Sequence, residues 1–245
     1  MTVFGLPWNV WEPVYEIILR EFGFSRAADE AARDDLENIL EGGGLRPDDL
    51  PDARNRTVAI VGAGPNLGDE LERAAEADLV FAASTASEKL LTAGIEVTIH
   101  DTDIDKDETV VRELVARNRP VAVHAHGDNT DALASIVPSL DPSCVFPTTQ
   151  AAPIPGVANP GGFTDGDRAA FLADALGAES LVFPGWDFTD PSVSATKRRK
   201  LVWAERLLAW LEQRRDDRFS VLNGRRSAIE LPAEMRPASD GSREG

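Results

Sequence analysis

The chain has 245 residues, which is enough for one sizeable α/β domain or two small ones. Its 42 Asp and Glu residues outnumber its 25 Lys and Arg residues, and the formal net charge of −17 at pH 7 argues against binding to nucleic acid or to an anionic membrane. The single cysteine excludes an internal disulfide, and without a membrane-length apolar run or a signal peptide the chain is expected to be cytoplasmic.

Residues 1–55 are expected to form an N-terminal helical segment. Trp11, Tyr15, Ile18 and Phe22 repeat at helical spacing, and a second helix is predicted over 26–40. Three successive glycines at 42–44 end that helix, because glycine favours neither helix nor strand. The polar, proline-punctuated stretch up to residue 55 is typical of a linker.

From residue 57 the texture changes to short β-branched runs that alternate with Ala/Glu/Leu-rich segments. The alternation predicts an α/β domain over 56–215, with a Rossmann-like, mainly parallel sheet flanked by helices. The predicted strands are 58–61, 79–83, 97–99, 121–124, 144–146 and 181–183. The predicted helices are 67–77, 85–93, 107–118, 130–137, 166–176 and 195–214. The charged tail 216–245 is expected to be partly disordered.

A glycine turn follows the first predicted strand. Gly62, Gly64, Pro65 and Asn66 lie between this strand and a helix start, where backbone N–H groups attract phosphate. The dinucleotide fingerprint G-x-G-x-x-G is not matched, because Leu67 stands where its third glycine belongs. Phosphate or nucleotide binding is therefore favoured over NAD or FAD binding and over a purely structural turn.

Three carboxylates follow the apolar run 97–99 at alternate positions. If a strand ends there, Asp101, Asp103 and Asp105 converge at its carboxyl end, where ligands bind in open α/β sheets. Carboxylates this close repel one another and need a cation, and oxygen ligands suit Mg²⁺. The alternative is an acidic surface loop, because the acid-rich, lysine-poor composition resembles that of proteins from salt-accumulating halophiles.

Another polar loop, 124–131, follows the next strand and holds two of the three histidines. The spacing of His124 and His126 is similar to that in metallohydrolases of the β-lactamase type, but a two-metal site needs more histidines, and His100 is the one left to add. Asp128 and Asn129 are the stronger candidates, since Gly127 permits a sharp turn before them. For His124 a buried, hydrogen-bonded role and a catalytic role stay open.

Further polar residues gather before the helix 166–176 and after the last strand. Thr164 or Asp165 would cap that helix, and Asp167, Arg168 or Phe163 could contact a polar or flat ligand. After the last strand Asp187 follows the flat indole of Trp186. The run 197–200, Lys-Arg-Arg-Lys, holds half of the four lysines and is suited to polyphosphate, although a basic first helical turn opposes the helix dipole.

Taken in order, these blocks resemble the archaeal 6-hydroxymethyl-7,8-dihydropterin pyrophosphokinases, the MptE-like family, which share the thiamin pyrophosphokinase-like fold. The resemblance covers roughly residues 57–212. It implies Mg²⁺-dependent transfer of diphosphate from ATP to the hydroxymethyl arm of a dihydropterin, with release of AMP, in folate- or methanopterin-type biosynthesis. ATP and a pterin are then the expected partners, and the oligomeric state is left open.

Residue roles follow from this resemblance. Asp101, Asp103 and Asp128 are predicted to hold Mg²⁺ and, with Lys197 and Lys200, to be catalytic. The predicted ATP-binding residues are Gly62, Gly64, Pro65, Asn66, His126, Gly127, Asn129 and Arg198. The predicted substrate-binding residues are Phe163, Asp165, Asp167, Arg168, Trp186 and Asp187. A thiamin pyrophosphokinase-like enzyme, a non-catalytic nucleotide-binding module and a metallohydrolase remain alternatives.

Overall fold

A six-stranded parallel sheet forms the centre of the molecule, as a computed structural model that describes residues 4–236 shows. The strand order is β5-β4-β3-β2-β1-β6. The strands are β1 (Thr57–Val61), β2 (Leu79–Ala83), β3 (Ile99–Thr102), β4 (Val121–Ala125), β5 (Val145–Thr149) and β6 (Ser180–Val182). The helices are α1 (Trp8–Phe22), α2 (Arg26–Leu40), α3 (Leu71–Ala75), α4 (Ala86–Thr92), α5 (Glu108–Ala116), α6 (Thr130–Ile136), α7 (Asp165–Ala175) and α8 (Ala195–Arg215). The predicted α/β fold is confirmed.

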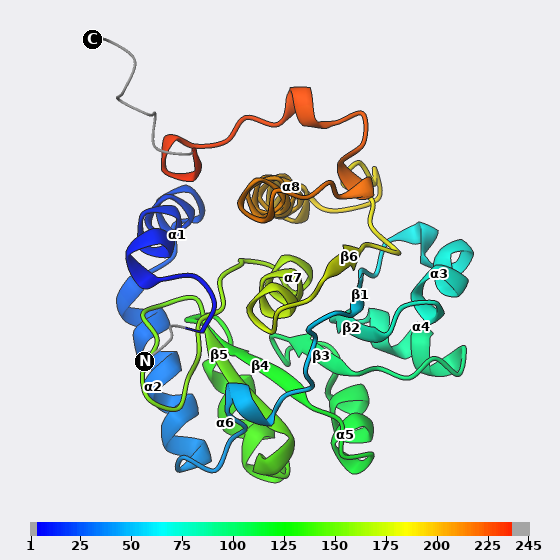
Figure 1. Cartoon of the computed structure of the whole chain (residues 1–245). Helices are drawn as coiled ribbons and strands as arrows, with labels where there is room; N and C mark the ends of the chain where they lie inside the picture. The colour runs from blue at the N-terminus through cyan, green and yellow to red at the C-terminus, as the bar shows by residue number, and fades with distance from the viewer. Residues whose placement is uncertain (1–3, 237–245) are drawn as a thin grey trace.

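Helices cover both faces of this sheet. Figure 1 shows α3, α4, α5 and α6 on one face, and α7 on the other face between the sheet and α8. Alternate strand residues serve the two cores: Val58 and Ile60 pack toward α7 and α8, whereas Ala59 and Val61 pack toward α3 and its neighbours. Burial on both faces explains why the strands are apolar runs without polar alternation.

The chain direction across the sheet changes at β1. Strands β1 to β5 follow one another in order, and the return from β5 to β6 carries α7 along the opposite face to the far side of β1. The loops after β1 and β6 therefore leave toward opposite faces, which is the place where open α/β sheets bind ligands.

The N-terminal helices enclose the β5 edge of the sheet. Apolar residues of α1 belong to the α7–α8 core, and Ala32, Leu36 and Leu40 of α2 belong to the other core. Ser25 caps α2 by accepting a hydrogen bond from the Ala28 N–H. Edge strand β5 tolerates Pro147 because an edge residue needs no N–H on its outer side.

The central acidic strand begins two residues later and ends three residues later than the sequence pattern predicts. In β3, His100 is in register with Val121 and Thr102 with Val123, so Asp101 belongs to the strand and Asp103 follows it. Residues of one strand alternate between faces, so Asp101 shares the α7 side with Ile99, while His100 and Thr102 face α4 and α5. The strand predicted from residue 144 also begins one residue later, and Cys144 is buried just before it.

Part of the C-terminal tail packs against the helical layer. The segment from residue 219 to residue 236 crosses α8 and reaches α1, and it buries Phe219, Leu222, Leu231 and Met235. The sequence pattern did not predict this packing, because the apolar residues are widely spaced in a charged segment. Residues 237–245 lie outside the described residues, so the partial disorder expected for the tail 216–245 stays a prediction. None of the helices between residues 4 and 236 is long and apolar enough to cross a membrane.

Candidate active site

Three carboxylates converge on one buried arginine at the carboxyl end of the sheet. The Arg168 guanidinium of α7 lies 3.2 Å from the Asp101 carboxylate and 2.5 Å from that of Asp103. It also pairs with Asp165, one turn earlier in α7. The structure brings Asp101 and Asp103 together, whereas Asp105, which was expected to join them, is exposed and pairs with Lys106. Sequence reasoning did not predict that Arg168 would neutralise Asp101 and Asp103.

The entry into α7 fixes this arginine. Gly161 and Gly162 have φ values of +105° and +95°, a conformation that side chains disfavour, and a Cβ on Gly162 would lie 2.6 Å from the Arg168 Cα. Thr164 is the N-cap residue, and Asp167 completes a capping box. The Asp167 carboxylate accepts hydrogen bonds from the N–H groups of Phe163 and Thr164, so its contacts are those of a cap.

Burial and charge give the three carboxylates different proton affinities. Burial raises the pKa of Asp101 well above its ordinary value despite the nearby Arg168 charge. For Asp103, burial acts in the same direction, but the charge of Arg168 and the contact with His126 outweigh it and hold the pKa well below its ordinary value. Burial and the charge of Asp103 raise the pKa of Asp165 to about 6. Three carboxyl groups against one guanidinium leave an excess of negative charge at neutral pH.

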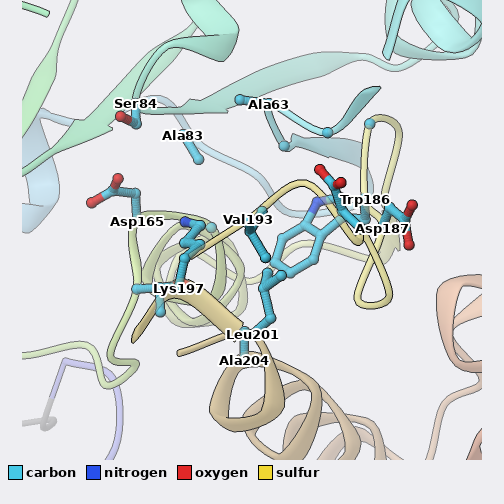
Figure 2. A pocket seen from close by; sticks show the side chains of 16 residues that line it. Ala63, Ala83, Ser84, Asp165, Trp186, Asp187, Val193, Lys197, Leu201 and Ala204 are labelled. Atoms are coloured by element: carbon cyan, nitrogen blue, oxygen red, sulfur yellow. The ribbon is translucent and has the colours of Figure 1, made fainter. Parts of the chain in front are cut away.

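A cavity of about 140 Å³ opens beside this cluster, between the ends of β1, β2 and β6 and the first turns of α7 and α8. Figure 2 shows Asp165 and Lys197 on one side of the cavity and the Trp186 indole on the other. Gly166 allows α7 to approach that indole, since a Cβ there would lie 2.7 Å from its ring. The lining residues are Gly62, Ala63, Gly64, Ala83, Ser84, Thr164, Asp165, Gly166, Gly185, Trp186, Asp187, Asp190, Val193, Lys197, Leu201 and Ala204.

The glycine turn lines this cavity, but its backbone donors are largely engaged. The N–H groups of Gly62 and Gly64 donate to the carbonyl oxygens of Pro184 and Gly185 at 3.0 and 2.8 Å. A Cβ on either glycine would lie 2.6 Å from the Gly185 oxygen, so close packing of the β1 and β6 turns accounts for both glycines. The Asn66 amide donates to Glu70 and to the Trp186 carbonyl, and Pro65 begins a short 3₁₀ helix. These contacts leave the predicted phosphate role of the turn untested.

A second, much smaller cavity lies on the other side of Arg168. It is about 10 Å³ in volume, which is room for about one water molecule. Arg168 pairs with Asp103 in its wall and with Asp165 in the wall of the larger cavity. The Lys200 ammonium lies 5.6 Å from the Phe163 ring centroid. The lining residues are Phe24, Asp103, His126, Gln150, Phe163, Arg168 and Lys200.

The loop after β4 contacts Asp103 through two side chains. The His126 Nε2 lies 3.5 Å from the Asp103 carboxylate, and the Asn129 amide donates to the Asp103 carbonyl oxygen at 2.8 Å. Asn129 also donates to the His124 carbonyl and accepts from the His126 N–H, so it fixes this loop. Asp128 is exposed and lines neither cavity.

His124 is buried and neutral. Burial lowers its pKa well below the ordinary value. Its Nδ1 lies 3.1 Å from the Thr148 hydroxyl, which itself donates to the Val123 carbonyl, so Nδ1 carries the proton. Within residues 4–236 its Nε2 has no hydrogen-bond partner. The buried role of His124 thus fits its surroundings, although one acceptor atom is left unpaired.

A hydrogen-bond network that sequence reasoning missed lies behind β3. His100 joins the Ser87 hydroxyl at 2.8 Å to the Asp107 carboxylate at 2.9 Å, and Thr102 donates to the other Asp107 oxygen. Ile104 has a φ of +59°, which is costly for a β-branched residue, and its N–H donates to Thr102. The network therefore braces the loop that begins at Asp103. The seven-residue spacing of His100 and Asp107 did not predict this contact in the sequence. The two residues meet because Asp107 lies at the start of α5, directly before residue 108.

The remaining predicted site residues are spread around the larger cavity. Trp186 lies in its wall and donates from Nε1 to the Ile60 carbonyl at 2.8 Å. The Asp187 carboxylate accepts from the N–H and hydroxyl of Thr189, so it closes its own turn. Of the basic block, Lys197 lines this cavity, Lys200 lines the small one, and Arg198 is exposed.

The donor chemistry of Asp103 and Asp165 fits Mg²⁺. Magnesium in phosphoryl-transfer sites is usually held by one or two carboxylates, with water and substrate phosphate completing its octahedron. The side chains of Asp103 and Asp165 are 20% and 19% exposed, and each lines a cavity. In the part of the chain that the structure describes, no three His, Cys, Asp or Glu side chains form a group that could hold a metal by themselves.

Comparison with known proteins finds relatives that carry one common name. Residues 35–192 match the family model described as 6-hydroxymethylpterin diphosphokinase MptE-like. A 6-hydroxymethyl-7,8-dihydropterin pyrophosphokinase of Methanothermobacter thermautotrophicus is 39% identical over 86% of this chain and 97% of its own length. Proteins of the same name from Pyrococcus furiosus and Methanocaldococcus jannaschii are 35% and 32% identical, over 92% and 85% of this chain and 99% and 97% of their own lengths.

Proposed function

The chain belongs to the MptE-like family of 6-hydroxymethylpterin diphosphokinases, and on this basis we propose that it transfers diphosphate from ATP to 6-hydroxymethyl-7,8-dihydropterin. The pterin hydroxyl oxygen attacks the β-phosphorus of ATP and gives up its proton, the bond between the β-phosphorus and the α,β-bridging oxygen breaks, and AMP leaves. The products are AMP and the pterin methyl diphosphate. Its place in pterin biosynthesis is part of this proposal.

The observation that carries the proposal is the position of the Arg168 cluster beside the larger cavity, because the smaller one has room for about one water molecule. Asp165 lines the larger cavity, Asp103 lines the smaller one, and Arg168 pairs with both. A transfer between two substrates needs donor and acceptor to meet at one charged centre that positions them. The cluster supplies such a centre at the sheet edge where ligands bind.

The larger cavity offers groups for a flat ring and for phosphate. The Trp186 indole is fixed by its hydrogen bond to Ile60, which suits it to stack on a ring, and Lys197 lies across the cavity from it. Lys197 would neutralise charge on the transferred group, and Lys200 would do so from the small cavity. Asp165 is the better candidate to read an aminopyrimidine edge, because the Asp187 carboxylate is engaged with Thr189.

Magnesium belongs to this proposal through Asp103, since one carboxylate can suffice where water and substrate phosphate complete the octahedron, and Asp165 keeps its role at the aminopyrimidine edge. When bound, Mg²⁺ would withdraw charge from phosphate oxygens. In this arrangement the deeply buried Asp101 orients Arg168, and Asp128 stays a candidate only if its exposed loop moves toward the cluster. A halophilic, cytoplasmic setting likewise remains a proposal that rests on composition.

Side-by-side assays with two acceptors test the proposed function. Purified chain is incubated with ATP and MgCl₂ and either 6-hydroxymethyl-7,8-dihydropterin or thiamin, at high salt, and AMP is measured by chromatography. We expect AMP with the pterin and none with thiamin. AMP formed with thiamin alone would replace the proposal by a thiamin pyrophosphokinase, and ATP binding without AMP from either acceptor would point to a nucleotide-binding module.

A further inference from the structure

A buried carboxylate of the N-terminal segment touches two of the site loops. Asp29 of α2 is 2% exposed and accepts three hydrogen bonds, each of 2.8 Å, from uncharged donors. Its Oδ2 accepts from the Tyr15 hydroxyl and from the Gln150 side-chain amide, and its Oδ1 accepts from the Gly127 N–H. Burying an ionised carboxylate is costly unless such donors surround it.

Two of these three donors belong to segments that line the small cavity. Gln150, just after β5, lies in its wall beside Asp103 and Arg168. Gly127 follows His126, which contacts Asp103 from the same wall. Asp29 itself is absent from that lining, and its hydrogen bonds reach the wall of the small cavity through Gln150 and Gly127.

The hydrogen bond from Gln150 also decides which way its amide faces. A carboxylate can only accept, so the Gln150 Nε2 must point at Asp29, and its Oε1 is left for another direction. The main chain of Gln150 is held separately, because its carbonyl accepts from the Trp11 indole at 2.9 Å and from the Asn159 amide at 3.0 Å. With backbone and amide both fixed, Gln150 has one defined orientation in the wall of the small cavity.

Close packing leaves the loop after β4 little freedom at the same point. A Cβ on Gly127 would lie 2.6 Å from the Ala28 Cβ, so the loop rests directly on α2. Figure 1 shows α2 beside the β5 edge, next to the strands that carry both segments. One side chain of α2 thus holds two loops that come from β4 and β5.

We propose that Asp29 is a positioning residue for diphosphate transfer, which holds Gln150 and the His126–Gly127 backbone against the Asp103–Arg168 cluster. The inference rests on the proposed function for its kinetic consequence. In this proposal α2 contributes to the active site through Asp29, although Asp29 does not line the larger cavity. Misplacement of site groups by about 1 Å can lower a rate on the order of 10²-fold.

The test compares Asp29→Asn with Asp35→Asn, an exposed acid of the same helix. An asparagine in place of Asp29 turns an N–H₂ group toward at least one of its donors. We expect kcat/KM for the pterin to fall on the order of 10²-fold in the first variant and to stay at the wild-type value in the second. In a double-mutant cycle with Gln150→Leu, the combined loss should be smaller than the product of the single losses.

Losses that multiply, or a folded Asp29→Asn enzyme with wild-type kcat/KM, would overturn the proposal. If Asp29→Asn does not fold, the Gln150→Leu variant alone tests the proposal. Wild-type kcat/KM in that variant would show that the hydrogen bond between Gln150 and Asp29 has no positioning role. Hydrogen exchange of the Gly127 amide gives a readout free of turnover: it should quicken at least tenfold in Asp29→Asn or, where that variant does not fold, in Tyr15→Phe. If the wild-type chain makes no AMP, the proposed function fails. Unchanged exchange of the Gly127 amide in the variant would separately contradict the positioning role of Asp29.

Discussion

At the scale of single residues, the candidate site places three carboxyl groups around one guanidinium, and their mutual repulsion lowers the stability of the fold. Arg168 faces three carboxyl groups, so each added negative charge is repelled by the others. Asp165 carries the clearest sign of this repulsion, because its pKa is raised to about 6 by burial and by Asp103. A carboxyl whose pKa is raised in this way, beside a cavity, is a candidate for a functional role.

Asp165→Asn should stabilise the fold above pH 6 and impair transfer. A carboxyl whose pKa is near 3.8 unfolded and about 6 folded binds its proton more tightly in the native state, so its ionisation lowers the free energy of unfolding as pH rises from 4 to 6. Two pKa units correspond to about 3 kcal/mol at most. Urea unfolding at pH 4.5 and pH 8 should show a clearly larger variant advantage at pH 8, because most of the linked stability is lost above pH 4.5. An equal advantage at both pH values would contradict the raised pKa.

His100→Leu should destabilise the protein even though His100 lines neither cavity. The change leaves the Asp107 carboxylate and the Ser87 hydroxyl buried without their partner, at a cost of about 1–3 kcal/mol or more in the free energy of unfolding. Ser87→Ala removes one neutral hydrogen bond and should cost about 1 kcal/mol. Urea denaturation measures both. A His100→Leu variant with a wild-type midpoint would show that the network carries no stability.

At the scale of elements, the strands and most helices follow from local sequence, but the contacts of the site do not. β-branched runs predict all six strands because parallel strands are buried on both faces. The shift of β3, by contrast, is set by pairing with β4, which the run 97–99 does not reveal. Arg168 and Asp101 lie 67 residues apart, and Asp29 and Gln150 lie 121 apart, so neither contact has a local signal. Ordered motifs predicted where the candidate site lies, and packing decides which groups meet there.

The first turn of α7 should depend on the glycine that meets Trp186. In Gly166→Ala the new methyl would lie 2.7 Å from the indole, so the ring or the helix must move. We expect a changed Trp emission spectrum and a raised KM for one substrate. Gly68→Ala is the matched control, because a Cβ at Gly68 meets no heavy atom within 4 Å. Equal behaviour of the two variants would remove Trp186 from the proposed binding surface.

At the scale of the whole molecule, the net charge of −17 acts against the compact state. The Debye length falls from about 10 Å at 0.1 M salt to about 3 Å at 1 M, so added salt screens repulsion between surface carboxylates. The same screening affects the Arg168 cluster less, because its side chains are mostly buried.

Salt should therefore raise the thermal stability of the protein. Between 0.1 and 2 M KCl we expect Tm to rise by roughly 5–15 °C, since a change of a few kcal/mol moves the Tm of a chain of this size by several degrees. Calorimetry measures this, and sucrose at matched osmolality controls for solvent exclusion. A Tm that stays constant or falls in KCl would contradict a repulsion-limited fold.

The destination of the β-phosphate tests the proposed transfer most directly. Enzyme in excess is mixed with ATP labelled at the β-phosphorus, MgCl₂ and 6-hydroxymethyl-7,8-dihydropterin, and the quenched products are separated. We predict label in the pterin product together with unlabelled AMP, and loss of both products in Asp103→Asn. Label that remains in ADP would mean transfer of a single phosphoryl group, and label that remains in ATP would mean no transfer; either result contradicts the proposed diphosphate transfer.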